Sequence, residues 1–207
     1  MGVSTAAERR RIGLFGGAFD PPHCAHVALA QQAIDELALD LLHVVPTGRA
    51  WHKKRTLSPA HDRLAMVQAA FASMPKSAVD ERELRRPGPS YTIDTLTELQ
   101  AQYPDAQLYL LIGADQAGAL TQWHGWAEVV RLAIISIARR PDAPSAPGPW
   151  AFETSPDART VALHLPDIPI NATQVRDRVA AGQPIDALVP PAVAGYIDFH
   201  HLYRPAR

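Results

Sequence analysis

The residues best suited to chemistry in this chain are two histidines at the end of a glycine-rich turn. The segment from Gly16 to His26 begins with two glycines and carries His23 three positions before its last residue. It follows a short apolar run and precedes an amphipathic one, which predicts a strand, a tight turn and the first turn of a helix. Both imidazoles should therefore lie on one helix face, beside the N–H groups of the helix start. Such a site favours an anion, and a phosphate is the obvious ligand.

Histidines placed in this way could donate hydrogen bonds to a phosphoryl group. As imidazolium ions they could also offset the charge that accumulates during phosphoryl transfer. Spacing alone would favour two structural histidines, or half of a metal site, because short motifs often occur by chance. The strand, glycine turn and helix start that surround them favour the phosphate interpretation.

A second candidate phosphate site lies near the other end of the chain. Asn171 and Gln174 predict an N-cap and the start of a helix. Thr173 and Arg176 are three apart on its first turn, so the hydroxyl and the guanidinium would lie side by side next to free N–H groups. An ordinary amphipathic helix with a solvated arginine fits these residues equally well. Two phosphate-binding helix starts in one chain suit a ligand with several phosphates.

Alternating apolar strands and helices are predicted to position both motifs. The apolar runs predict strands at 12–15, 41–45, 108–112, 133–138 and 161–165, and 78–84 is compatible with a short one. Helical spacing and capping residues predict helices that start at His23, after the N-cap Ser58, after Ser90 or Thr92, at Leu120, after Asn171 and at Pro191. We expect an α/β fold, a Rossmann-like doubly wound, mainly parallel sheet with helices on both faces.

One domain of residues 11–207 is expected, preceded by a flexible N-terminal tail at 1–10. Residues 141–157 are rich in proline, alanine, serine and glycine, which predicts a long surface loop inside that domain. The polar, basic stretch at 47–56 should form a loop at the carboxyl ends of the strands, where open α/β sheets bind ligands.

Composition excludes several classes of function. The chain has 207 residues and a formal charge of −1, so no basic field suggests a nucleic acid or an anionic membrane as partner. The single cysteine, Cys24, excludes an internal disulfide and a multi-cysteine zinc site. No apolar run is long enough to cross a bilayer, and residues 1–11 lack a signal-peptide core. A cytoplasmic protein is expected, and its oligomeric state is left open.

These motifs resemble signatures of the nucleotidyltransferases related to the class I aminoacyl-tRNA synthetases. Gly16 to His26 resembles their first signature, and Ile170 to Arg176 resembles their second. Further segments resemble the nicotinate mononucleotide adenylyltransferases of bacteria in particular: Ser90 to Leu96, Ile112 to Asp115, Trp123 and Arg139 to Pro141. The likeness extends from about Ile12 to Tyr203 and so covers nearly the whole chain.

The resemblance implies an enzyme that transfers the adenylyl group of ATP to nicotinate mononucleotide. The products would be nicotinate adenine dinucleotide and pyrophosphate, in the biosynthesis of NAD. Mg²⁺ would arrive with ATP, and no protein side chain is expected to bind a metal. The alternatives are another adenylyltransferase of the superfamily, with phosphopantetheine or nicotinamide mononucleotide as acceptor, or a nucleotide-binding protein without catalysis.

The resemblance also implies roles for individual residues. The catalytic residues would be His26, His23 and Arg176. The residues expected to bind ATP are Gly16, Gly17, Phe19, His23, His26, Thr173 and Arg176. Those expected to bind nicotinate mononucleotide are Thr92, Asp115, Trp123, His124, His52, Lys53 and Arg140. A packing role for Trp123 and a solvated basic loop at His52 and Lys53 are the alternatives.

Two positions depart from the family pattern. Ala25 stands where the family usually has glycine, which adds a methyl group close to the phosphates. Asn171 replaces the usual serine of the second signature, although asparagine is at least as good an N-cap. These departures motivate the alternative of a protein that binds a nucleotide without turnover.

Overall fold

The structure is a computed structural model of the chain, and it describes residues 9–49, 56–139, 150–164 and 168–205. The described residues form one six-stranded sheet in the order β3-β2-β1-β4-β5-β6, with parallel neighbours throughout. The strands are β1 (Arg11–Gly17), β2 (Leu41–Pro46), β3 (Ser77–Val79), β4 (Gln107–Gly113), β5 (Ala133–Arg139) and β6 (Thr160–His164). This is a doubly wound order, and its direction reverses between β1 and β4, where such sheets bind ligands.

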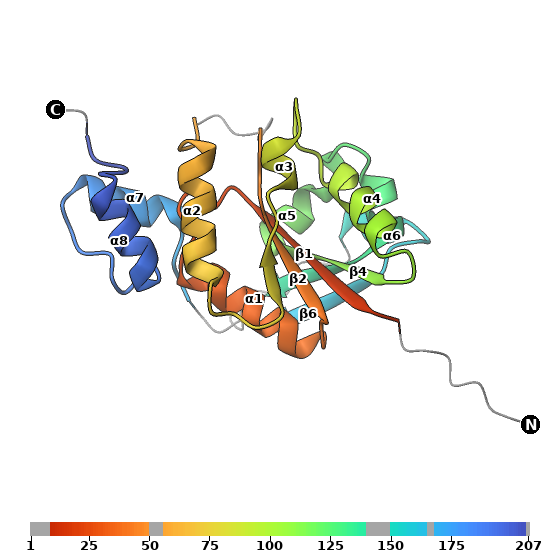
Figure 1. Cartoon of the computed structure of the whole chain (residues 1–207). Helices are drawn as coiled ribbons and strands as arrows, with labels where there is room; N and C mark the ends of the chain where they lie inside the picture. Colours follow the sequence, from red (N-terminus) through yellow and green to blue (C-terminus); the bar gives the residue numbers. More distant parts are fainter. Residues whose placement is uncertain (1–8, 50–55, 140–149, 165–167, 206–207) are drawn as a thin grey trace, which may run out of the picture.

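Helices cover both faces of the sheet (Figure 1). One face carries α1 (Cys24–Glu36) and α2 (Ala60–Phe71), and the other carries α4 (Thr92–Gln102) and α6 (Trp126–Leu132). The short helices are α3 (Arg82–Arg85), α5 (Ala114–Ala119), and the 3₁₀ helices η1 (Leu120–Gln122) and η2 (Ala151–Thr154). The last two helices, α7 (Ala172–Ala180) and α8 (Pro191–Phe199), lie beyond α2 at the left of Figure 1. The predicted fold class is confirmed.

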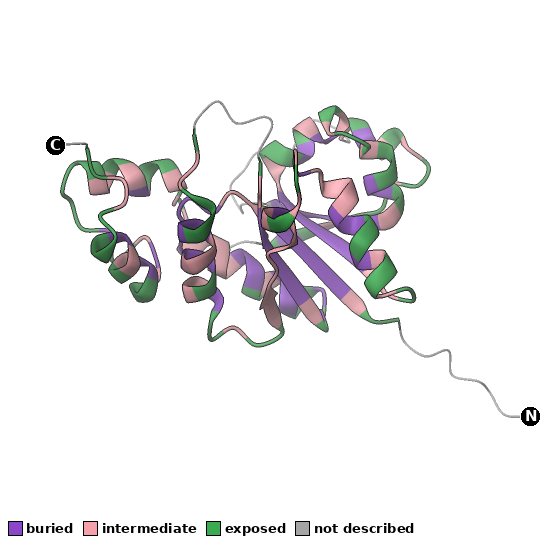
Figure 2. Ribbon diagram, turned by 45° about the horizontal axis from the view of Figure 1, so that its top comes forward, coloured by how far each residue is buried: buried purple, intermediate pink, exposed green. Residues whose placement is uncertain are grey.

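The central strands are buried on both faces, which explains why they are continuous apolar runs. On β4, Leu108, Leu110 and Ile112 face the core under α4 and α6. Tyr109 and Leu111 face the opposite core under α1 and α2. Figure 2 shows the same layering, with buried strands inside and exposed residues on the outer sides of the helices. Among the described residues, no helix is both long and apolar enough to cross a membrane.

A third apolar cluster attaches α7 and α8 to the side of α2. Met66 on α2 packs with Val175 on α7 and with Val193 and Ile197 on α8. The first turn of α7 carries the second predicted phosphate motif. This cluster therefore positions that motif relative to the sheet.

Two predicted helix caps are wrong because tertiary contacts use the residues differently. The helix α2 begins at Ala60 with Pro59 as its N-cap, and the N–H of Ser58 donates to the Asp20 carboxylate instead. The N-cap of α4 is Tyr91, and neither predicted alternative, Ser90 or Thr92, occupies that position. By contrast, the side chain of Asn171 caps α7 as predicted, and it accepts from the Gln174 N–H at 2.9 Å.

Two predicted elements are interrupted by local turns. The strand suggested at 78–84 ends at Val79, because the Asp80 carboxylate accepts from the Arg82 N–H and starts the turn into α3. The helix predicted at 120–130 is divided into η1 and α6. Gly125 separates them with a φ of 65°, a left-handed conformation that a helix cannot continue through. The short helix α5 was not predicted.

The predicted tail and surface loop both contain residues that are fixed in the structure. The Arg10 carbonyl accepts from the Gln107 N–H at 2.8 Å, and its guanidinium lies over the Tyr103 ring, so the predicted tail is wrong at this residue. Residues 1–8 and 141–149 lie outside the described residues. The end of the proline-rich segment is not a surface loop, because it forms η2 and its Phe152 is completely buried.

Truncating Phe152 therefore tests whether this segment belongs to the core. We expect Phe152→Ala to lower the free energy of unfolding by about 3–5 kcal/mol, the usual cost of a large cavity. Phe199→Ala is the matched control, since that side chain is 80% exposed, and a change within about 0.5 kcal/mol is expected. Denaturant unfolding followed by circular dichroism measures both. Equal effects of the two variants would contradict the assignment.

Candidate active site

The two glycines at the end of β1, Gly16 and Gly17, differ in what surrounds them. A Cβ on Gly17 would lie 3.1 Å from the Phe19 ring, a tight contact that favours glycine there. A Cβ on Gly16 would meet nothing within 4 Å, and this exposed backbone leaves room for a ligand. Phe19 has a φ of 45°, which turns its ring into the core against Phe15 and Phe71. Phe19 is 2% exposed, so it supports the turn from beneath.

The predicted pairing of His23 and His26 is present. His23 is the N-cap of α1, and the two rings stack with centroids 3.7 Å apart and planes 28° apart. The Nδ1 atom of His26 accepts from the His23 N–H at 3.2 Å. An accepting Nδ1 carries the lone pair, so the proton of the neutral His26 ring is on Nε2. His26 is thereby prepared to donate a hydrogen bond from Nε2.

Burial sets the protonation state of His23. The residue is 6% exposed, and its desolvation lowers its pKa from 6.5 to about 4. Its Nδ1 is buried without a hydrogen-bond partner among the described residues. His23 is therefore a neutral imidazole at neutral pH in this structure, and its role as an imidazolium ion beside a phosphate stays a prediction. Two stacked cations at this separation would also repel each other.

Part of each helix start is already occupied. The Cys24 N–H donates to the Leu188 carbonyl at 2.9 Å, and the Gln174 N–H is taken by Asn171. These amides are not available to an anion. An anion at this site would therefore be bound more by side chains, and less by helix N–H groups, than the two motifs predict.

The two predicted phosphate motifs meet through Arg176. Its Nη2 donates to the Thr173 hydroxyl at 2.9 Å, which confirms the pairing predicted from their spacing. Its Nη1 donates to the Asp20 carbonyl at 2.8 Å, across 156 residues of sequence. The guanidinium is thereby held between the α7 motif and the turn that leads to His23. Both motifs belong to a single site at the switch point of the sheet.

A buried carboxylate fixes the turn that precedes the histidines. Asp20 is 2% exposed. Its Oδ1 accepts from the Tyr203 hydroxyl at 2.6 Å, and its Oδ2 accepts from the Ser58 N–H at 3.1 Å. Burial and the adjacent carboxylate raise the pKa of Tyr203, which keeps the hydroxyl protonated as the donor. Sequence analysis missed Tyr203, because a lone tyrosine near the C-terminus carries no motif of its own.

A buried arginine holds the neighbouring loops. Arg63 on α2 is 2% exposed. Its guanidinium donates to the carbonyls of Ala18 and Thr47 at 3.0 and 2.8 Å, and its Nε donates to the Ser58 carbonyl at 3.0 Å. The segments after β1 and β2 are therefore tied to the start of α2. In the sequence, Arg63 was indistinguishable from a solvated helix residue.

The residues predicted for the second substrate surround the N-terminus of α4. The Tyr91 and His124 rings lie 4.3 Å apart, and a Cβ on Gly125 would lie 3.2 Å from Ile93. Thr92, at the start of α4, is thus close to the loop that carries His124. Tyr91 was not among the predicted site residues, although it lies within the quoted Ser90 to Leu96 motif.

The other predicted residues of this region have mixed outcomes. Asp115 is exposed on the first turn of α5, directly beyond the end of β4. Trp123 is partly buried and packs against the core, which agrees with the packing alternative. The remaining three, His52, Lys53 and Arg140, lie outside the described residues.

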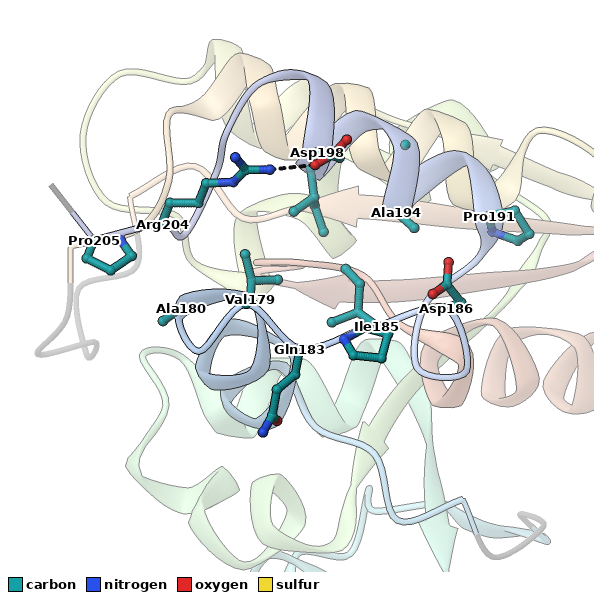
Figure 3. A pocket seen from close by; sticks show the side chains of 14 residues that line it. Val179, Ala180, Gln183, Ile185, Asp186, Pro191, Ala194, Asp198, Arg204 and Pro205 are labelled. Carbon is teal, nitrogen blue, oxygen red and sulfur yellow. Dashed lines mark hydrogen bonds and ion pairs between the residues drawn. The ribbon is translucent and has the colours of Figure 1, made fainter. Parts of the chain in front are cut away.

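A hollow of about 850 Å³ lies at the opposite end of α7 from Thr173 and Arg176. Figure 3 shows it between the last turn of α7 and α8. Its one arginine, Arg204, is paired with Asp198. These residues offer no cluster of cationic donors for a phosphate. The residues of the two motifs therefore remain the predicted phosphate site.

The low pKa of His23 predicts how stability depends on pH. Between its ordinary pKa of 6.5 and its folded pKa of about 4, the unfolded chain binds more protons at His23 than the folded chain. The free energy of unfolding should therefore fall as the pH drops through this window, by up to about 3 kcal/mol from this residue. His23→Asn, which removes the titratable imidazole and places a favoured residue at the N-cap position, should give a flatter profile in denaturant titrations. Parallel profiles for the two proteins would contradict the burial effect.

Comparison with known proteins agrees with this geometry. The cytidylyltransferase-like family matches residues 14–178. A probable nicotinate-nucleotide adenylyltransferase of Albidiferax ferrireducens is 52% identical, over 95% of this chain and 100% of the relative. One of Methylibium petroleiphilum is 42% identical, over 98% of this chain and 96% of the relative.

A solved structure shares the fold. The nicotinic acid mononucleotide adenylyltransferase of Plasmodium falciparum, complexed with NaAD, superposes with a TM-score of 0.76. It is 18% identical, and the match covers 94% of this chain and 98% of that one. The resemblance inferred from the motifs is confirmed. The chain belongs to the nicotinate-nucleotide adenylyltransferases, within the cytidylyltransferase-like family.

Proposed function

We propose that this chain transfers the adenylyl group of ATP to nicotinate mononucleotide. The observation that carries the proposal is the contact of Arg176 with Thr173 and with the Asp20 carbonyl, because it joins two anion-binding motifs into one site for a polyphosphate. The names of the relatives support the choice of acceptor, as does the Plasmodium falciparum enzyme complexed with NaAD.

The reaction is a single displacement at phosphorus. A phosphate oxygen of nicotinate mononucleotide attacks the α-phosphorus of ATP and forms the new P–O bond. The bond from the α-phosphorus to the oxygen that bridges it to the β-phosphorus breaks, and pyrophosphate leaves with that oxygen. The nucleophile is already ionised, so the protein needs no general base. Catalysis then consists of positioning and of stabilising negative charge.

The first motif and α7 supply donors for the ATP phosphates. His26 would donate from Nε2, while Arg176 and Thr173 would bind oxygens on the α7 side. His23 is neutral in the free protein, and a nearby triphosphate would raise its pKa because a negative charge favours the imidazolium form. His23 therefore becomes a better charge partner only when ATP is bound.

The acceptor would lie beside the start of α4. Thr92 and the backbone near His124 are proposed to bind the nicotinate carboxylate, with Trp123 against the ring and Asp115 at the mononucleotide. For the mononucleotide phosphate we propose His52, Lys53 and Arg140.

The chemistry of the described site fits a metal that arrives with its substrate. No group of three histidine, cysteine, aspartate or glutamate residues in the described part of the chain is placed to hold a metal ion. The residues around the histidines present donors for phosphate oxygens, and the Asp20 oxygens accept from Tyr203 and Ser58. Mg²⁺ bound to ATP would offset charge on the departing pyrophosphate. We propose a cytoplasmic location, in keeping with the single cysteine of the chain.

A panel of acceptors tests the proposed reaction. Pyrophosphate release is measured with ATP and, in turn, nicotinate mononucleotide, nicotinamide mononucleotide and phosphopantetheine. We expect kcat/KM to be highest for nicotinate mononucleotide. A wide preference for the amide or for phosphopantetheine would refute the proposal. Binding of ATP by calorimetry without turnover of any acceptor would favour a non-catalytic nucleotide-binding protein.

Substitution of His26 tests its role in stabilising charge. His26→Ala should lower kcat by about 100-fold or more, the usual loss when a donor to the transition state is removed. The Kd for nicotinate mononucleotide should change much less. The control is His61→Ala on α2, whose side chain is 79% exposed, and its kinetics should match those of the unmodified enzyme. Equal losses in kcat and in acceptor binding would exclude the proposed role.

A further inference from the structure

Glu83 is a buried carboxylate that the reaction as described does not use. It lies on α3 and is 6% exposed. Its Oε1 accepts from the Thr95 hydroxyl at 2.8 Å, and that hydroxyl also accepts from Arg86 Nη1 at 3.3 Å. Thr95 is itself completely buried, one turn into α4. A buried carboxylate is costly unless it is hydrogen-bonded, so this arrangement must hold α3 and α4 together closely.

The loop after β2 packs closely against Glu83 and Ser90. A Cβ on Gly48 would lie 2.2 Å from the Glu83 carbonyl oxygen and 2.8 Å from the Ser90 hydroxyl, so glycine is required. The Ser90 N–H donates to the Arg49 carbonyl at 3.1 Å. Burial raises the pKa of Glu83, while Thr95, Arg86 and the Gly48 N–H favour its ionised form. Glu83 therefore lies where α3, α4 and the loop after β2 converge.

The junction of α3, α4 and the loop after β2 includes Ser90, which directly precedes the residues proposed to bind the acceptor. Ser90 is followed by Tyr91, whose ring packs against His124, and by Thr92, the first residue of α4. The positions of Thr92 and His124 thus depend on how α4 is seated. Rotation or sliding of α4 by a fraction of an ångström would change the backbone donors offered to a carboxylate. The ATP motifs have a separate support in Asp20, which binds Tyr203 through its carboxylate and Arg176 through its carbonyl.

We propose that Glu83 is a positioning residue for the acceptor, which seats the start of α4 through Thr95 and the loop at Gly48. This inference rests on the proposed function, because it assigns Glu83 to the nicotinate mononucleotide half of that site. Its consequence is selective: loss of the carboxylate disturbs acceptor binding and leaves the phosphate motifs for ATP in place.

Glu83→Gln, which conserves shape and removes charge, is the principal test. Steady-state pyrophosphate release gives KM for both substrates, and calorimetry gives the Kd for nicotinate mononucleotide alone. We expect both acceptor values to rise roughly tenfold while KM for ATP changes less than about twofold. Glu98→Gln is the matched control, since Glu98 is an exposed carboxylate that also pairs with Arg86. It should leave all these values unchanged.

Thr95 supplies a second, independent pair of variants. Thr95→Val removes the donor to Glu83 and should reproduce the selective rise in acceptor KM, whereas Thr95→Ser keeps the hydroxyl and should restore near-normal values. Thermal unfolding of each variant shows whether it is folded. Equal changes for ATP and acceptor, or a lowered Tm with unchanged acceptor binding, would overturn the inference. Failure of the unmodified protein to use nicotinate mononucleotide would instead overturn the proposed function.

Discussion

The site depends on one buried carboxylate that joins distant parts of the chain. Asp20 accepts from Tyr203, 183 residues away, and its own carbonyl accepts from Arg176 on α7. This carboxylate is 2% exposed and would be strongly destabilising without its donors, the Tyr203 hydroxyl and the Ser58 N–H. The bonds from Tyr203 and Arg176 to Asp20 therefore also hold the C-terminal part of the chain against the turn after β1. Assembly of the phosphate site is thereby coupled to completion of the fold.

The histidines illustrate how packing determines chemistry in this site. The Phe19 ring lies edge-on to His26, with centroids 5.0 Å apart, and so limits the positions that the imidazole can take. The hydrogen bond from the His23 N–H selects the tautomer of His26. Burial lowers the pKa of His23 and keeps its ring neutral at neutral pH. A donor held in place before the reaction stabilises charge without reorganisation at the moment of transfer. The arrangement of these histidines is thus the one that we propose for binding a phosphate.

Sequence patterns predicted the elements whose signals are local. Continuous apolar runs located β1, β2, β4, β5 and β6, and spacing of three residues correctly paired His23 with His26 and Thr173 with Arg176. Long-range contacts were not predictable from such patterns. Nothing near Phe152 indicates that it fills the core, and nothing near Arg63 indicates that three carbonyls surround it. The caps of α2 and α4 were missed for the same reason, because tertiary contacts overrode local preference.

The two halves of the site are stabilised in different ways, and this difference has a consequence for specificity. Contacts of Asp20 with Tyr203 and Arg176 cross most of the sequence, and they hold the residues proposed to bind the phosphates of ATP. On the acceptor side, the bond from Thr95 to Glu83 spans only 12 residues. On the proposal made for Glu83, a change there alters acceptor binding without loosening the phosphate motifs. The proposal thus places the determinants of acceptor choice in one local segment of the chain, apart from the long-range contacts that hold the phosphate motifs.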